Sequence, residues 1–226
     1  MQTLIETELI YFHDWTLRVR STERPERLLL LLHGYTGDEN SMWVFARGLP
    51  SRYWMIAPRA PHIAEGGGYT WRPLQRLDPS TGSGQDFGKP TLDQLRAPAE
   101  DLLSLVDAYR ASAGIDASVF DVMGFSQGAV MSSVLSFLYP QRIRKVGFLA
   151  GFVPSELEAL APRHPLEGKP FFVAHGVKDE TIPIDRARRS VATLEEAGAQ
   201  VTYCEDEVGH KVSAGCLSGL KAFFAD

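Results

Sequence analysis

The segment Val119–Gly128 contains the residue best placed to carry chemistry, Ser126. A short apolar run of strand length leads directly into the pentapeptide Gly-Phe-Ser-Gln-Gly, and residues 129–139 have helical character. A Gly-x-Ser-x-Gly sequence between a strand and a helix predicts a sharp turn that exposes the serine hydroxyl. Glycines flank the serine because side chains at those positions would collide with the turn. We therefore expect Ser126 to act as a nucleophile.

A serine hydroxyl needs a neighbouring base to take its proton, and histidine commonly serves. In enzymes built on this turn the acid and the histidine follow the serine along the chain, which leaves His164, His175 and His210. His164 lies in a proline-bounded loop, and the glycine after His175 suggests a packed backbone turn. His210 lies between the last expected strand and the last expected helix, at the sheet end where the serine should be. We predict that His210 is the base.

The acid that orients the histidine should follow the strand expected at residues 170–175. Asp179 and Glu180 both lie in the loop after this strand, so the residues themselves leave two candidates. The acidic run at 205–207 precedes the histidine and is predicted to be a solvated connection.

Acyl transfer also requires N–H donors for the oxyanion that forms on the attacked carbonyl. The backbone N–H of Gln127, the residue after the nucleophile, is one expected donor. The other should come from the loop after an earlier strand, at its His-Gly junction. This loop begins with His33 and Gly34, so the N–H of Tyr35 is the candidate, with Thr36 next. His33 itself is predicted to be packed within the loop.

Strands alternate with helices along most of the chain, which predicts βαβ units and a mainly parallel sheet. Strands are expected at residues 9–12, 16–20, 28–32, 53–57, 119–123, 144–150, 170–175 and 201–204. Helices are expected at residues 38–49, 91–113, 129–139, 183–197 and 214–224. No repeat and no linker interrupts this pattern, so residues 1–226 are predicted to form a single domain.

An irregular stretch at residues 58–90 is rich in glycine and proline and contains Tyr69, Trp71 and Phe87. Long loops of this kind are usually functional, and aromatic side chains are rarely left in water without cause. We expect the loop to face substrate, with Tyr69 and Trp71 as apolar contacts that favour short- to medium-chain esters. Phe152 is a further candidate contact and fits a pocket or the core equally well.

Composition and charge exclude several kinds of partner. The formal net charge is −5, and no basic stripe is present, which argues against nucleic-acid binding. No apolar run approaches the roughly 20 residues of a membrane span, so no stable membrane insertion is expected. The N-terminal residues lack the features of a signal peptide, which predicts a cytoplasmic protein. Cys204 and Cys216 are accordingly expected to be free thiols.

Taken in order, these motifs resemble the phospholipase/carboxylesterase family of α/β-hydrolases, which includes acyl-protein thioesterases and small bacterial carboxylesterases. The matching segments are Leu-Leu-His-Gly at 31–34, Gly-Phe-Ser-Gln-Gly-Ala at 124–129, His-Gly-x-x-Asp-x-x-Ile-Pro at 175–183 and Gly-His at 209–210. The Gly-Tyr-Thr-Trp segment at 68–71 is also similar to a family segment that places an aromatic residue near the acyl site.

The resemblance implies an α/β-hydrolase fold with a mainly parallel central sheet, helices on both faces and no large lid domain. In this family the acid is the aspartate of His-Gly-x-x-Asp, which favours Asp179 and implies a triad of Ser126, Asp179 and His210. It also implies an enzyme that needs no metal or organic cofactor and works as a monomer or homodimer.

The activity that follows is hydrolysis of a small-molecule carboxylic ester through an acyl-enzyme. An acyl-thioesterase or a lysophospholipase would use the same three residues, and a catalytically silent binding protein of this fold is a further alternative. A dienelactone-type hydrolase is disfavoured because its nucleophile would be cysteine. The chain departs from thioesterase members at residues 35–37, where they have Leu-Gly, and in a glycine-rich stretch at 74–90. Both departures lie where substrate would bind.

Overall fold

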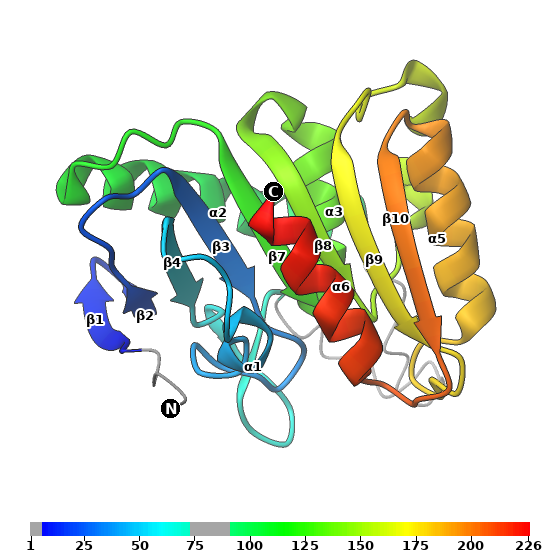
Figure 1. Ribbon diagram of the computed structural model, residues 1–226, viewed down its shortest axis with the longest axis horizontal. Coiled ribbons are helices and arrows are strands. Elements are labelled where there is room, and N and C mark those ends of the chain that lie inside the picture. The colour runs from blue at the N-terminus through cyan, green and yellow to red at the C-terminus, as the bar shows by residue number, and fades with distance from the viewer. Residues whose placement is uncertain (1–5, 73–90) are drawn as a thin grey trace, which may run out of the picture.

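The computed structural model describes residues 6–72 and 91–226, which build an eight-stranded sheet flanked by helices (Figure 1). The strands of this sheet are β1 (Glu8–Phe12), β2 (Trp15–Arg20), β3 (Arg27–Leu32), β4 (Tyr53–Pro58), β7 (Phe120–Phe125), β8 (Ile143–Leu149), β9 (Pro170–Gly176) and β10 (Gln200–Asp206). A separate short hairpin pairs β5 (His62–Ile63) with β6 (Tyr69–Thr70). The helices are α1 (Trp43–Ala46), α2 (Leu92–Ala113), α3 (Gln127–Leu138), α4 (Ser155–Glu158), α5 (Ile184–Glu196) and α6 (Ala214–Ala225).

The strand order is β1-β2-β4-β3-β7-β8-β9-β10, and the strands from β4 to β10 are parallel. Only β1 and β2 run antiparallel to their neighbours. After β3 the chain moves outward to β4 and then returns to the other side of β3 as β7. The connections after β3 and β7 therefore leave in opposite directions, and open α/β sheets bind ligands at such a point. The loop after β3 and the turn after β7 lie at this edge of the sheet.

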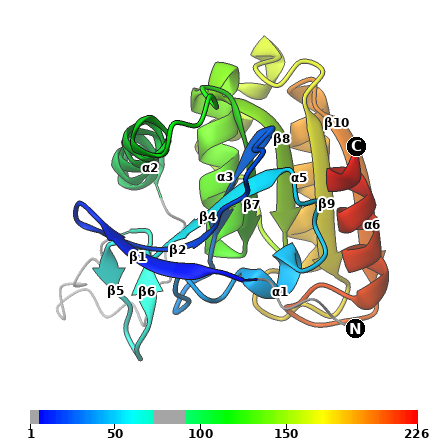
Figure 2. The same ribbon diagram turned by 60° about the vertical axis from the view of Figure 1, so that its left-hand side comes forward.

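Helices cover both faces of the sheet. Figure 2 shows α2 and α3 on one side and α6 on the other, and the buried residues of α5 belong to the same core as those of α2 and α3. The consecutive leucines of β3 are fully buried because alternate side chains enter the two opposite cores. The mainly parallel sheet with helices on both faces is thus as predicted. Among the described residues, no helix combines the length and apolar character needed to cross a lipid bilayer.

One predicted helix is much shorter than expected. Residues 38–49 contain only the single helical turn α1. The backbone between Asp38 and α1 forms a different turn, which the side chain of Asp38 stabilises. Its Oδ1 accepts hydrogen bonds from the Asn40 N–H at 2.9 Å and the Ser41 hydroxyl at 3.0 Å. Such side-chain bonds compete with helix formation. Within the predicted loop at 58–90 the structure adds the hairpin of β5 and β6, while residues 73–90, including Phe87, lie outside the described residues.

The expectation of free thiols is wrong, because Cys204 and Cys216 form a disulfide. Cys204 lies on β10 and Cys216 in the first turn of α6, which packs back along β10 and β9. This return places the two Cα atoms 5.7 Å apart, within the range that a disulfide spans. Two isolated cysteines carry no pairing signal, so only the tertiary packing reveals the bond. The closed loop contains His210.

We expect the disulfide to stabilise the fold. Replacing both cysteines, Cys204→Ala with Cys216→Ala, should lower the free energy of unfolding by about 3 kcal/mol, because the unfolded chain loses a constraint on a short loop. Denaturant titration measures the difference, and wild-type protein unfolded in the presence of a reductant serves as the control. Alkylation of both cysteines in unfolded, unreduced protein would contradict the bond.

Candidate active site

Three of the predicted residues form one continuous hydrogen-bonded chain. The Ser126 hydroxyl is 2.9 Å from Nε2 of His210, and Nδ1 of His210 is 2.7 Å from Oδ2 of Asp179. The residues follow β7, β10 and β9, and therefore meet at the carboxyl ends of three parallel strands. With the carboxylate accepting from Nδ1–H, Nε2 is the unprotonated nitrogen and faces the hydroxyl.

The carboxylate of Asp179 is held by its own loop. The side chain is buried, and its Oδ1 accepts hydrogen bonds from the backbone N–H groups of Thr181 and Ile182, both at 2.9 Å. Its Oδ2 is left to face His210. Glu180, the other candidate acid, is exposed. The structure therefore brings Asp179 to the histidine and leaves Glu180 in solvent.

His175 contributes to the site in a way that the sequence did not suggest. Its Nε2 donates to the carbonyl oxygen of Ile182 at 2.8 Å and lies 3.4 Å from Oδ2 of Asp179. The imidazole is buried and closes the turn that carries the acid. A glycine follows because a Cβ at Gly176 would lie 2.2 Å from the carbonyl oxygen of Gly209. This approach presses the acid loop against the histidine loop.

The backbone of Ser126 adopts φ 53° and ψ −116°, values that glycine favours. The turn is held by a hydrogen bond from the Ser126 N–H to the Leu149 carbonyl oxygen at 2.8 Å. Both flanking glycines are sterically required. A Cβ at Gly124 would lie 2.1 Å from the carbonyl oxygen of Gly128, and one at Gly128 would lie 2.0 Å from that of Leu32. The turn is therefore packed directly on the end of β3.

The loop after β3 borders Ser126. A Cβ at Gly34 would lie 3.3 Å from Cβ of Ser126, so Tyr35 follows a residue in contact range of the serine. Thr36 has φ 65°, and its N–H donates to the Tyr69 carbonyl oxygen at 3.0 Å. Gln127 is the first residue of α3, where backbone N–H groups have no acceptor within the helix. The two segments expected to supply oxyanion donors are thus adjacent.

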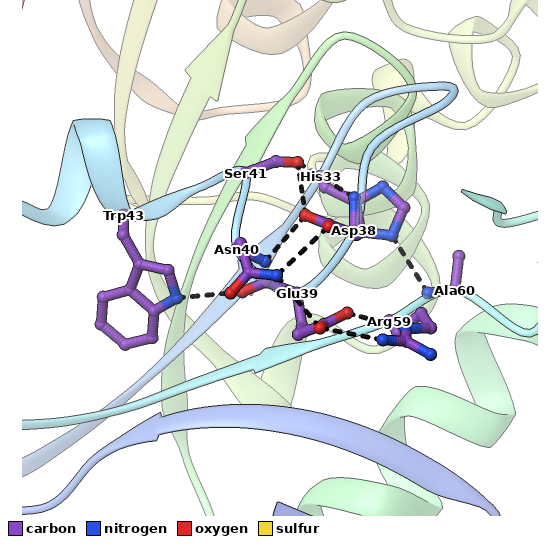
Figure 3. A network of polar contacts seen from close by, with 8 residues as sticks. All are labelled: His33, Asp38, Glu39, Asn40, Ser41, Trp43, Arg59 and Ala60. Carbon is purple, nitrogen blue, oxygen red and sulfur yellow. Dashed lines mark hydrogen bonds and ion pairs between the residues drawn. The ribbon is translucent and has the colours of Figure 1, made fainter. Parts of the chain in front are cut away.

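The imidazole of His33 fixes the start of this loop, as Figure 3 shows. Its Nε2 accepts a hydrogen bond from the Ala60 N–H at 3.0 Å, and its Nδ1 donates to the Gly34 carbonyl oxygen at 2.7 Å. Burial lowers the pKa of His33, which keeps the ring in the neutral form that this pattern requires. The prediction of a packed His33 is confirmed.

An ion pair holds the loop from the other side. The buried carboxylate of Glu39 accepts two hydrogen bonds from the guanidinium of Arg59, at 2.7 and 2.9 Å (Figure 3). The bonds from Arg59 lower the pKa of Glu39. The pair connects the loop after β3 to the loop after β4. Sequence reasoning missed it, because each residue lies in a polar stretch where charged side chains are usually solvated.

A protein-family model described as Phospholipase/Carboxylesterase matches residues 16–225. The chain belongs to the phospholipase/carboxylesterase family. It is therefore a serine hydrolase with the α/β-hydrolase fold, and no large lid domain is evident among the described residues.

Individual relatives of this chain carry names that belong to this family. Acyl-protein thioesterase 1 of Debaryomyces hansenii is 26% identical over 229 residues, which cover 93% of this chain and 95% of that protein. A probable carboxylesterase of Oryza sativa subsp. japonica is 25% identical over 173 residues, covering 74% of this chain and 62% of its own. The carboxylesterase from Mesorhizobium loti has the same fold, with a TM-score of 0.78 at 21% identity over 97% of this chain and 98% of that one.

The three predicted substrate contacts are separated in the structure. Trp71 is fully buried, its Nε1 donates to the His33 carbonyl oxygen at 2.8 Å, and its backbone N–H donates to the Gln127 side chain at 3.0 Å. It joins the loop after β3 to the nucleophile turn, so the expected direct contact with substrate is corrected to a packing role. Tyr69 is half-buried beneath the Arg59 guanidinium and lines a cavity of about 530 Å³ beside Phe12.

Phe152 lines a different cavity, of about 750 Å³, with Pro183 and residues of α5. Phe152 and Pro183 are both close in sequence to residues whose backbone groups bind Ser126 or Asp179. Phe152 is three residues beyond Leu149, which binds the Ser126 N–H, and three residues span at most roughly 11 Å. Pro183 follows Ile182, which binds the Asp179 carboxylate. Two residues that line this cavity therefore lie within three residues of a group that binds Ser126 or Asp179.

Within the described part of the chain, no group of three or more histidine, cysteine, aspartate or glutamate side chains could hold a metal ion.

We expect Gly128→Ala to lower the free energy of unfolding by about 3 kcal/mol or more, because backbone atoms obstruct the added methyl group. Gly215→Ala is the matched control, since nothing lies within 3.7 Å of a Cβ there and alanine favours the helix. Denaturant titration compares the two. Equal stability of Gly128→Ala and wild-type protein would contradict the close approach of the turn to β3.

Glu39→Gln should reduce kcat by about tenfold, less than the loss of a whole oxyanion donor, because it loosens the loop without removing it. It should also reduce stability. The pKa of Glu39 is lowered in the folded protein. Its contribution to the free energy of unfolding is therefore present above the pKa of the unfolded state and is lost as the pH falls through the pKa of the folded state. The stability difference from wild type should therefore shrink in acid. The exposed Glu26→Gln is the control, and a Glu39→Gln variant with wild-type kcat would contradict the positioning role.

Proposed function

We propose that this protein is a serine carboxylesterase that hydrolyses short- to medium-chain carboxylic esters through Ser126, His210 and Asp179. The single observation that carries the proposal is the unbroken chain of hydrogen bonds from the serine hydroxyl to the buried carboxylate, at 2.9 and 2.7 Å. A nucleophile, a base and an orienting acid in this order are the parts that acyl transfer to serine requires.

In the first step His210 accepts the Ser126 proton while the serine oxygen bonds to the ester carbonyl carbon. Asp179 keeps the proton on Nδ1 and stabilises the imidazolium that forms. The backbone N–H groups of Gln127 and Tyr35 donate to the oxyanion of the tetrahedral intermediate. The intermediate collapses when the carbon–oxygen bond of the alcohol breaks, and His210 gives its proton to the leaving alkoxide.

The second step repeats this chemistry with water. His210 takes a proton from water as its oxygen attacks the acyl-enzyme carbonyl, and the same N–H groups bind the second oxyanion. Cleavage of the acyl bond to Ser126 then releases the carboxylic acid, and the proton returns to the serine. The chain's own residues account for every proton transfer.

The cavity beside Phe152 supports a short or medium acyl or alcohol group, because its volume of about 750 Å³ is that of a small-molecule site. The second candidate activity is thioester hydrolysis, which the name of the Debaryomyces hansenii relative favours. It would use the same residues. A lysophospholipase is a further alternative with an unchanged nucleophile.

Ser126→Ala should lower kcat for p-nitrophenyl butyrate by on the order of 10⁴-fold or more, because no other group replaces the nucleophile. A fluorophosphonate probe should label wild-type protein and not this variant. Ser136→Ala is the matched control, since that hydroxyl is buried in α3 and donates to the Ser132 carbonyl oxygen. It should keep both activity and labelling.

Undiminished turnover by a folded Ser126→Ala variant would overturn the proposal. Comparison of kcat/KM for a butyrate ester, a butyryl thioester and a lysophospholipid then separates the candidate activities. A thioester preferred by more than tenfold would favour the second one.

A further inference from the structure

The cavity lined by Phe152 combines an apolar part with four charged side chains, those of Arg186, Arg189, Asp185 and Glu158. Phe152 and Pro183 form the apolar part, and Arg186 and Arg189 project from successive turns of α5. The two arginines lie three residues apart, so they occupy the same side of the helix. The hydrolysis of a neutral ester requires neither charge.

Arg186 is the better defined of the two. Its guanidinium carbon lies 3.3 Å from the centre of the Phe152 ring, and its side chain is half-buried. Burial and the neighbouring Arg189 lower its pKa, so its charge is partly desolvated. No described carboxylate lies within ion-pair distance of it. A desolvated cation without a counter-charge is costly, and binding of an anion would relieve that cost.

Asp185 and Glu158 also line the cavity, but neither carboxylate lies within ion-pair distance of Arg186 or Arg189. Asp185 lies 3.9 Å from Arg188, which also forms a two-bond pair with Glu205 on β10. Glu158 of α4 is exposed and reaches Arg186 only through longer-range attraction. The first turn of α5 also opens on this cavity, and the N-terminal end of a helix favours negative charge.

We propose that this cavity binds a carboxylate carried by the ester substrate, with Arg186 as the principal contact and Arg189 as the second. The inference rests on the proposed esterase function and specifies its substrate class as anionic esters. A planar guanidinium stacked on Phe152 presents its N–H edge to a carboxylate, and arginine can bind both oxygens of that group. The carboxylate can belong to the acyl part or to the alcohol part.

The test compares esters that differ by one charge. For the acyl part, the pair is p-nitrophenyl butyrate and mono-p-nitrophenyl succinate, which have acyl chains of the same length. For the alcohol part, it is p-nitrophenyl butyrate and the butyrate ester of a carboxy-substituted nitrophenol. Rates measured with Ser126→Ala are subtracted, because the free carboxylate of the succinate ester accelerates its spontaneous hydrolysis.

We expect wild-type protein to prefer the charged member of at least one pair. Arg186→Gln should reduce the charged-to-neutral ratio of kcat/KM by about tenfold or more, because a charge-assisted contact is lost. Arg189→Gln should reduce it less, since this side chain is exposed, and it supplies the test if Arg186→Gln fails to fold. Arg188→Gln is the matched control on the same helix and should leave the ratio unchanged. Added salt should weaken the preference.

The outcomes separate the two proposals. A preference for the succinate ester that Arg186→Gln removes assigns the carboxylate to the acyl part, and the same result with the substituted phenol assigns it to the alcohol part. Ser126-dependent turnover of the neutral ester without any charge preference, or a preference that survives in both arginine variants, overturns this inference and leaves the esterase proposal standing. Failure of wild-type protein to hydrolyse any of the esters contradicts both.

Discussion

Close contact between backbone segments at the carboxyl ends of the parallel strands is the constraint on which the rest of the site depends. At Gly128 the nucleophile turn meets the Leu32 carbonyl, and at Gly176 the acid loop meets the Gly209 carbonyl, each with no room for a side chain. These two contacts bring loops from distant parts of the chain together before any catalytic side chain is considered. The hydrogen bonds of Ser126, His210 and Asp179 are then a consequence of where their loops must lie.

Around these contacts lies a layer of residues that touch no reacting atom. His33 and the pair of Glu39 with Arg59 hold the loop after β3, and Trp71 joins that loop to the nucleophile turn. His175 closes the turn of the acid. Preorganised N–H groups are effective only when they need not move during the reaction. In the proposed mechanism the polar bonds of this layer act indirectly, by fixing the backbone positions of the N–H donors.

Much of this arrangement could be read from sequence, because glycines and their neighbours record local steric requirements. The Gly-x-Ser-x-Gly turn, the packed His33 and the succession of strands and helices along the chain all follow from short-range patterns. The residues that were missed depend on tertiary packing. Whether Cys204 meets Cys216, or Trp71 faces a substrate or the core, is decided by elements that only the folded chain brings together. The shortness of α1 reflects a competition at Asp38 that hydrophobic spacing does not record.

The backbone angles of Ser126 carry a consequence for how this site can change over time. Positive φ at a residue with a Cβ costs stability, and glycine would adopt the same turn without that cost. The fold alone would thus favour glycine at this position, and the nucleophilic role proposed for Ser126 supplies a reason for serine to be there instead. A lineage released from the need for catalysis would be expected to lose this hydroxyl early, while the loops around it, fixed by backbone packing, remained as they are.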